Sequence, residues 1–167
     1  MERSHDKLKQ EDACHFVTTN VLNKDPIFLN DVYCKILWDE IFVYVDLYHI
    51  DLFGFVIMPD HLHILFWPRC KKTASEFMRG IKSMSAKKIL KISNANEKEL
   101  PVTDHVMGGV PRPRHLWQST YFDYITTSKF TIQQKLEYMK QNPVKANFVL
   151  EPEDYKWLYI NLNLTQN

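Results

Sequence analysis

Apolar positions along the chain fall into short runs, typical of strands, and into spaced residues, typical of helices. Strands are predicted at residues 14–19, 49–58 and 61–67. The Pro59-Asp60 turn between the last two runs predicts that they pair antiparallel. Helices are predicted at residues 31–45, 73–92 and 131–141. We expect the last helix to end at Asn142-Pro143, because the residue before a proline disfavours helical geometry.

The remaining segments are interpreted from their turn residues and their apolar content. Residues 94–115 contain Gly108-Gly109 and two prolines, so we expect a loop there, and we expect residues 116–125 to be extended. The tail, about residues 150–167, is apolar enough that we expect it to pack on the rest of the protein. The element order predicts one α+β domain over residues 1–167, with helices on one face of an antiparallel sheet.

Composition narrows the class of protein. Hydrophobic residues make up 45% of the chain and charged residues 25%, which is ordinary for a globular protein. The three cysteines are scattered and form no CxxC pair, which favours a reducing, cytoplasmic compartment over a disulfide framework. No apolar run approaches the roughly 20 residues that a membrane span needs, and the polar N-terminus lacks a signal-peptide core. We therefore expect a soluble, cytoplasmic protein without a membrane partner.

Charge is nearly balanced overall but is locally basic. The formal net charge is +1, whereas residues 69–91 carry eight basic side chains against the single acid Glu76. Such a stripe can neutralise nucleic-acid phosphates, and it is equally typical of a solvated helix face. The charge pattern by itself leaves both interpretations open.

The histidine pair His61 and His63 is the first candidate for chemistry. In a strand, residues two apart point to the same side, so both imidazoles would face one direction while Leu62 faces the other. Two neighbouring imidazoles can bind one divalent cation. Two half-exposed histidines at a strand end would give the same pattern, so the pair alone indicates a metal site without establishing one.

Three segments together resemble a known family. They are the Met58-Pro59-Asp60-His61-Leu62-His63 segment, the Leu116-Trp117-Gln118 segment with the aromatic residues after it, and the Tyr138-Met139-Lys140-Gln141-Asn142-Pro143-Val144-Lys145 segment. In this order they resemble the IS200/IS605-like HUH tyrosine transposases, and especially the REP-associated tyrosine transposases. The resemblance implies a ferredoxin-like α+β sandwich.

The resemblance also implies roles for particular residues. Tyr138 would be the nucleophile of a DNA endonuclease and strand transferase that forms a 5′-phosphotyrosine intermediate. His61, His63 and Asn142 would hold a divalent metal, Mg²⁺ or Mn²⁺, a ligand set that suits these ions better than structural zinc. Asn142 follows Tyr138 by four residues, so the two share a helix face.

Two other tyrosines, Tyr121 and Tyr124, are rival nucleophiles in the same region of the chain. Tyr124 stands where family members often carry histidine, so this chain departs from the family pattern there.

The expected partner is single-stranded or hairpin DNA, and a homodimer is a further possibility that the resemblance raises. The candidate DNA-binding residues are Arg79, Lys82, Lys87, Lys88, Trp117 and Gln118. Two alternatives stay open. One is a domesticated relative that binds hairpins without cutting them, and the other is an RNA-binding or metal-hydrolase domain of unrelated descent.

Overall fold

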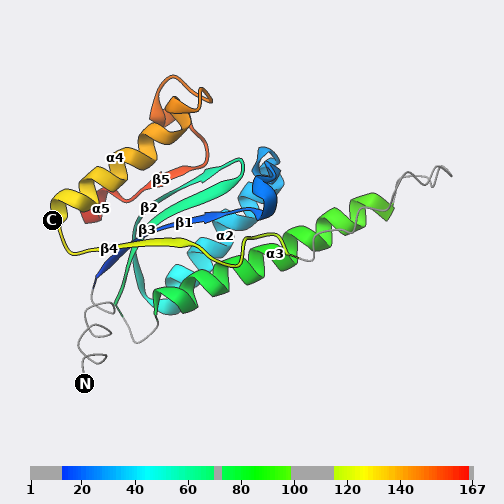
Figure 1. The fold of residues 1–167 in the computed structure, drawn as a ribbon, viewed down its shortest axis with the longest axis horizontal. Helices are drawn as coiled ribbons and strands as arrows, with labels where there is room; N and C mark the ends of the chain where they lie inside the picture. The colour runs from blue at the N-terminus through cyan, green and yellow to red at the C-terminus, as the bar shows by residue number, and fades with distance from the viewer. Residues whose placement is uncertain (1–12, 70–72, 99–114, 166–167) are drawn as a thin grey trace.

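The computed structural model describes residues 13–69, 73–98 and 115–165. Its centre is a five-stranded antiparallel sheet with strand order β4-β1-β3-β2-β5 (Figure 1). The strands are β1 (Cys14–Asn20), β2 (Ile50–Met58), β3 (His61–Pro68), β4 (Phe122–Thr126) and β5 (Leu158–Ile160). The helices are α2 (Asp31–Tyr48), α3 (Ala74–Lys98), α4 (Lys129–Lys145) and the short α5 (Leu162–Thr165). Single 3-10 turns are η1 (Leu22–Lys24), η2 (Ile27–Leu29) and η3 (Pro152–Asp154).

The hairpin of β2 and β3 confirms the predicted antiparallel pair. Met58 pairs with His61 across the turn, and the turn itself is held from β1 and η2. The backbone N–H of Val21 donates to the carbonyl of Asp60 at 2.8 Å, and that of Phe28 donates to the carbonyl of Pro59 at 3.0 Å. Because the backbone is fixed on both sides, the start of β3 is a rigid platform for the residues that follow the turn.

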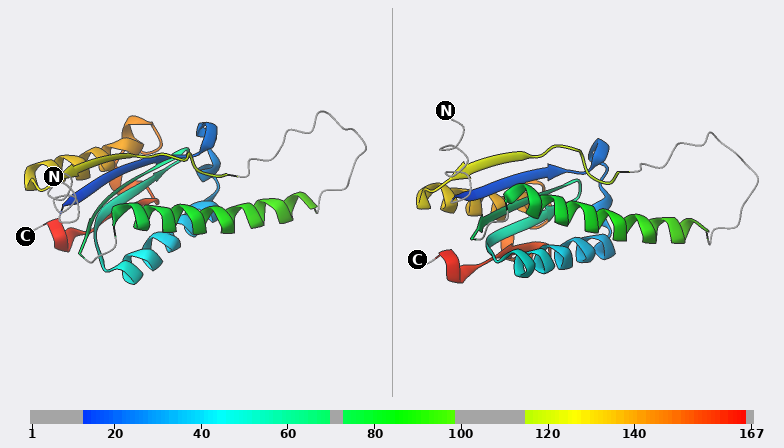
Figure 2. Two further views of the ribbon diagram at one scale, coloured as in Figure 1. Left: turned by 60° about the horizontal axis from the view of Figure 1, so that its bottom comes forward. Right: turned by 90° about the horizontal axis from the view of Figure 1, so that it is seen from below.

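The helices lie on both faces of the sheet, which differs from the predicted arrangement on one face. In the left view of Figure 2, α2 and α3 lie beneath the sheet and α4 lies above it. The central strands explain this, because their apolar residues face both ways. Val17, Phe55 and Ile64 pack against α2 and α3, whereas Phe16, Val56 and Leu65 pack against α4. A strand that is apolar on both faces needs a layer on each side to exclude water. The α+β class and the antiparallel sheet are as predicted.

Two helices are longer than their sequence patterns indicate. Helix α4 runs through Pro143 to Lys145 instead of ending at Asn142. A proline removes one N–H donor, and its ring crowds the carbonyl four residues earlier, so near the end of a helix it disturbs only the last turn. The backbone of the last turn is otherwise bonded, since Ala146 N–H donates to the Asn142 carbonyl at 3.0 Å. Helix α3 includes residues 94–98, which were expected to begin a loop, and its C-terminal part extends past the sheet in Figure 1. Residues 99–114 of that expected loop lie outside the described residues.

The C-terminal segment adds the fifth strand. Strand β5 pairs with β2 through the Gly54–Ile160 and Val56–Leu158 partners. Gly54 is required at this contact, because a Cβ there would lie 2.7 Å from the Tyr159 carbonyl oxygen. The hydroxyl of Tyr155 donates to the Ile57 carbonyl at 2.9 Å. The described part of the tail therefore packs on the sheet, as expected.

Within the described residues, no helix is both long enough and apolar enough to cross a membrane.

Candidate functional site

His61 and His63 lie together on the face of the sheet that α4 covers. Both belong to β3, and their ring centroids are 4.7 Å apart with the planes nearly perpendicular. The intervening Leu62 is fully buried on the opposite face. The predicted shared direction of the two imidazoles is therefore what the fold produces.

Each imidazole is oriented by a hydrogen bond at its Nδ1 atom. Thr18 on β1 contacts His63 Nδ1 through Oγ1 at 2.7 Å, and the Asp60 carboxylate contacts His61 Nδ1 at 2.6 Å. A carboxylate only accepts, so His61 Nδ1 is the donor and the proton sits on that nitrogen. Both Nδ1 atoms are therefore engaged, and the Nε2 atoms are the ring nitrogens left over for a cation. A ligand histidine in a metal site is commonly oriented by such an outer hydrogen bond.

His63 is held in its neutral form. It is only 5% exposed, and this burial is the main reason that its pKa is lowered from 6.5 to about 3, with smaller contributions from the neighbouring His61 and Lys135. A neutral imidazole has a lone pair available for a metal ion, whereas an imidazolium has none. The environment of His63 therefore favours ligation near neutral pH.

Tyr138 approaches the histidine pair from α4. Buried Ile132, Leu136 and Met139 anchor the helix on the sheet. The Tyr138 ring centroid lies 5.3 Å from that of His63, while 44% of the side chain remains exposed. The tyrosine thus reaches the site and stays accessible to a large substrate.

Asn142 lies one helical turn after Tyr138. Its amide Nδ2 donates to the Tyr138 carbonyl at 2.9 Å, which leaves the Oδ1 atom available. Among the described residues, no group of three or more His, Cys, Asp or Glu side chains could hold a metal. The candidate donor set is instead two imidazoles and an amide oxygen. With the Nδ1 atoms already engaged, this set fits Mg²⁺ or Mn²⁺ completed by water or substrate oxygens.

The two rival tyrosines, Tyr121 and Tyr124, lie on opposite sides of the sheet. Tyr121 packs against the core on the α2 and α3 side, with the Lys82 ammonium 5.6 Å from its ring centre. Tyr124 lies on β4 and is the cross-strand partner of Phe16 on β1. Its side chain therefore lies on the same face of the sheet as α4. Tyr124 is therefore near the histidine pair and Tyr121 is not.

Several candidate DNA-binding residues line a groove between α3 and residues 115–121. The groove encloses about 560 Å³, and its walls include Arg79, Lys82, Lys87, Trp117, Gln118 and Tyr121. Lys82 donates to the Gln118 carbonyl at 2.8 Å, and burial lowers its pKa. The groove lies on the sheet face opposite Tyr138, because α3 covers that face.

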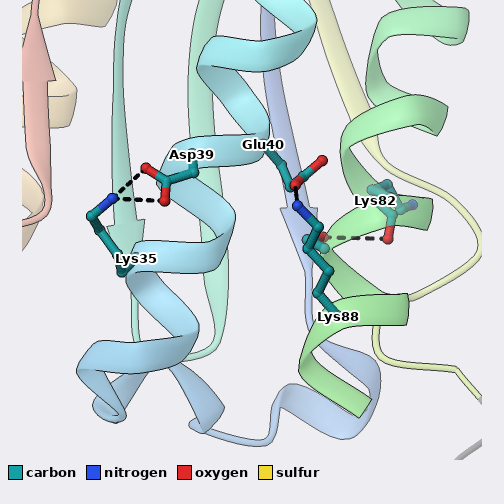
Figure 3. Close-up of polar contacts among 6 residues, drawn as sticks. Lys35, Asp39, Glu40, Lys82 and Lys88 are labelled. Atoms are coloured by element: carbon teal, nitrogen blue, oxygen red, sulfur yellow. Dashed lines mark hydrogen bonds and ion pairs between the residues drawn. The ribbon is translucent and has the colours of Figure 1, made fainter. Parts of the chain in front are cut away.

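Two of the candidates have structural roles that the sequence did not reveal. Trp117 is only 5% exposed, and its indole N–H donates to Ser85 Oγ at 3.1 Å, so it offers no free face for stacking a base. Lys88 pairs with Glu40 of α2, a carboxylate that is 2% exposed (Figure 3). Its charge therefore compensates a buried anion, a role that the sequence alone did not indicate.

Sequence reasoning missed the residues that surround the histidines. Thr18 and Lys135 lie far from them in the chain, and only the pairing of β1 with β3 and the packing of α4 bring them together. Asp60 was part of the quoted motif, and its place directly before His61 was the one available signal.

Comparisons with known proteins identify a family and a fold for this chain. The sequence profile of the family described as "Transposase IS200 like" matches residues 13–142. Comparison with curated protein sequences gave no match. A solved REP-associated tyrosine transposase bound to a REP hairpin is similar, with a TM-score of 0.65 and 18% identity over 89% of this chain and 76% of the other. A protein from Deinococcus radiodurans R1 assigned as a transposase has a TM-score of 0.51 and 18% identity over 78% of this chain and 90% of its own.

The fold and the site define an α+β protein with paired histidines beside a helix tyrosine. The chain belongs to the IS200-like transposase family, because the matched region spans most of it and includes both histidines, Tyr138 and Asn142. The predicted resemblance is thereby confirmed, and the solved structures share its fold.

Proposed function

We propose that this protein is a metal-dependent DNA endonuclease and strand transferase that cuts and rejoins single-stranded or hairpin DNA through Tyr138. The observation that carries the proposal is the placement of an accessible tyrosine ring 5.3 Å from a neutral, oriented histidine. A tyrosine on a helix is ordinarily a packing residue, but 44% exposure beside two neighbouring imidazoles suits a nucleophile.

The covalent step conserves atoms and charge. Tyr138 Oη bonds to the phosphorus, and the bond between phosphorus and the 3′-oxygen of the preceding nucleotide breaks. The tyrosine loses its proton and the leaving 3′-oxygen gains one, so the products are a 5′-phosphotyrosyl strand and a free 3′-OH. Because a phosphodiester replaces a phosphodiester, attack by a 3′-OH can run the step backwards and rejoin strands without ATP.

His61, His63 and Asn142 would hold Mg²⁺ or Mn²⁺ through two Nε2 atoms and one Oδ1 atom. A bound divalent ion supplies positive charge that polarises the scissile phosphate. The protein's contribution is orientation, since Thr18 and Asp60 fix the imidazole rings before substrate arrives. A tyrosine hydroxyl is protonated in water near neutrality and is then a weak nucleophile, so the reaction requires such assistance.

Hairpin DNA is the proposed substrate class. The similar REP-associated transposase was solved with a REP hairpin, and the groove beside α3 presents exposed Arg79 and Lys87 to a phosphate backbone. We also propose that the protein forms a homodimer. The molar mass in solution, measured by light scattering with and without DNA, tests this part of the proposal.

Cleavage of end-labelled hairpin oligonucleotides tests the proposal. We expect cutting with Mg²⁺ or Mn²⁺, none with EDTA, and none with the Tyr138→Phe or His61→Ala/His63→Ala variants. Tyr33→Phe is the matched control and should cut normally, since Tyr33 on α2 packs on the opposite side of the sheet and does not line the groove. Clear hairpin binding without cutting, on a varied panel of hairpins, would instead support the non-cleaving binding protein. Hydrolysis that survives Tyr138→Phe would indicate a water-dependent nuclease.

A further inference from the structure

Lys135 is a basic residue of the site that the family resemblance did not single out. It precedes Tyr138 by three residues on α4, so the two side chains share a helix face, and Asn142 extends the same row one turn further. The Lys135 ammonium lies 4.9 Å from the ring centre of Phe16 and 4.7 Å from that of Tyr124. The two aromatic residues are direct cross-strand partners on β1 and β4, so they form one seat for the ammonium.

This aromatic seat joins Lys135 to the histidine and the tyrosine. The Phe16 ring stacks on His63 at 5.5 Å with an interplanar angle of 13°, and it meets the Tyr138 ring edge-on at 5.9 Å. The positive charge of Lys135 is close enough to contribute to the lowered pKa of His63. Lys135 therefore lies on the same side of the sheet as the site and borders it.

The charge of Lys135 is not neutralised by a carboxylate. In the part of the chain that the structure describes, Lys135 forms no ion pair, whereas the nearby Glu137 contacts Lys140 and Gln141. The two aromatic rings attract the ammonium but provide no conventional acceptor for its three N–H donors. A half-buried cation with unused donors beside an exposed tyrosine suits an anionic ligand.

We propose that Lys135 binds a non-bridging oxygen of the DNA phosphate that Tyr138 attacks. This inference rests on the proposed function and adds a phosphate-binding residue to it. Lys135 would then contact the phosphodiester from one side of Tyr138, whereas Asn142, which would help to hold the metal, follows the tyrosine by one helical turn. Lys135 contributes charge and hydrogen bonds from one side, where the aromatic seat limits its rotamers before DNA binds.

The dependence of DNA affinity on salt tests this directly. Each neutralised phosphate of single-stranded DNA contributes about 0.7 to the slope of log affinity against log salt. We would measure that slope for a labelled single-stranded oligonucleotide in a Tyr138→Phe parent, which cannot form the tyrosyl adduct. Adding Lys135→Gln should reduce the slope by about 0.7, and adding Lys135→Arg should restore it.

Lys140→Gln in the same parent is the matched control. Lys140 also lies on α4, but two residues from Tyr138 on another side of the helix, and it contacts Glu137. We expect its slope to equal that of the parent. Equal slopes for Lys135→Gln and the parent would overturn the inference, as would equal decreases for Lys135→Gln and Lys140→Gln, or a parent that binds no DNA.

A second readout is the rate of covalent adduct formation, measured in protein that retains Tyr138. Loss of one preorganised donor to a developing anion typically slows a reaction about 100-fold, and we expect a decrease of that order for Lys135→Gln at saturating metal. Wild-type protein that binds DNA but forms no adduct would refute the proposed cleavage chemistry. In that case the salt dependence of DNA binding would still test the role of Lys135. An unchanged adduct rate in Lys135→Gln would refute Lys135 alone.

Discussion

The burial of neutral His63 predicts a loss of stability in mild acid. In the unfolded chain this imidazole takes a proton below its ordinary pKa of 6.5, whereas in the folded protein its pKa is about 3. Protons are therefore bound preferentially by the unfolded state between these values. The stabilisation is fully present above pH 6.5 and is lost progressively as the pH falls through 6.5 towards 3.

The magnitude follows from the difference in pKa. One pKa unit corresponds to about 1.4 kcal/mol, so at about pH 5 the free energy of unfolding should be lower by about 2 kcal/mol than near neutrality. Burial is the largest cause of the lowered pKa, and the side chain is 5% exposed, so solvent screens this effect little.

Urea unfolding in EDTA at about pH 7.5 and about pH 5 measures this difference. His63→Gln keeps a polar side chain opposite Thr18 but removes the titrating group, so its difference should be smaller than that of the wild type by about 2 kcal/mol. His49→Asn is the matched control, because His49 is exposed at the end of α2 in a left-handed conformation that asparagine also adopts. The reasoning is refuted if His63→Gln retains the full wild-type difference.

Three further predictions concern the metal, the tail and the groove. Thr18→Val removes the hydrogen bond to His63 and should weaken Mn²⁺ binding about 10- to 100-fold by calorimetry, while Thr18→Ser should retain it. Gly54→Ala places a Cβ against the Tyr159 carbonyl and should lower the free energy of unfolding by about 1–3 kcal/mol, and an unchanged melt would contradict that contact. Arg79→Gln should reduce the salt slope of hairpin binding by about 0.9 without changing the melt, and an unaltered slope would remove Arg79 from the interface.

The hairpin that carries the histidines could be predicted because its signals are local. The alternation in β3 fixes the direction of His61 and His63, and the Pro59-Asp60 turn fixes which strand lies beside it. The start of α2, predicted at residue 31, also has a local cause, since the Asn30 side chain accepts a hydrogen bond from the Val32 N–H.

What could not be predicted depends on contacts between distant segments. The order of elements along the chain does not determine which face of the sheet a helix covers. The position of α4 therefore could not be predicted from the sequence. Lys88 looked like one of several surface cations until Glu40 was placed beside it by the packing of α2 on α3. The burial of Trp117 likewise depends on a distant segment, since its indole N–H donates to Ser85 on α3.

The most direct test of the account is to identify the residue that carries DNA after the reaction. Trypsin should release Tyr138 in residues 136–140, LEYMK, in which it is the only tyrosine, whereas Tyr121 and Tyr124 fall together in residues 115–129. Wild-type protein would be incubated with hairpin DNA and Mn²⁺, digested with nuclease and trypsin, and analysed by tandem mass spectrometry. A nucleotide on Tyr138 is the predicted result. A nucleotide on the 115–129 peptide, or cut DNA with no modified peptide, would contradict the account.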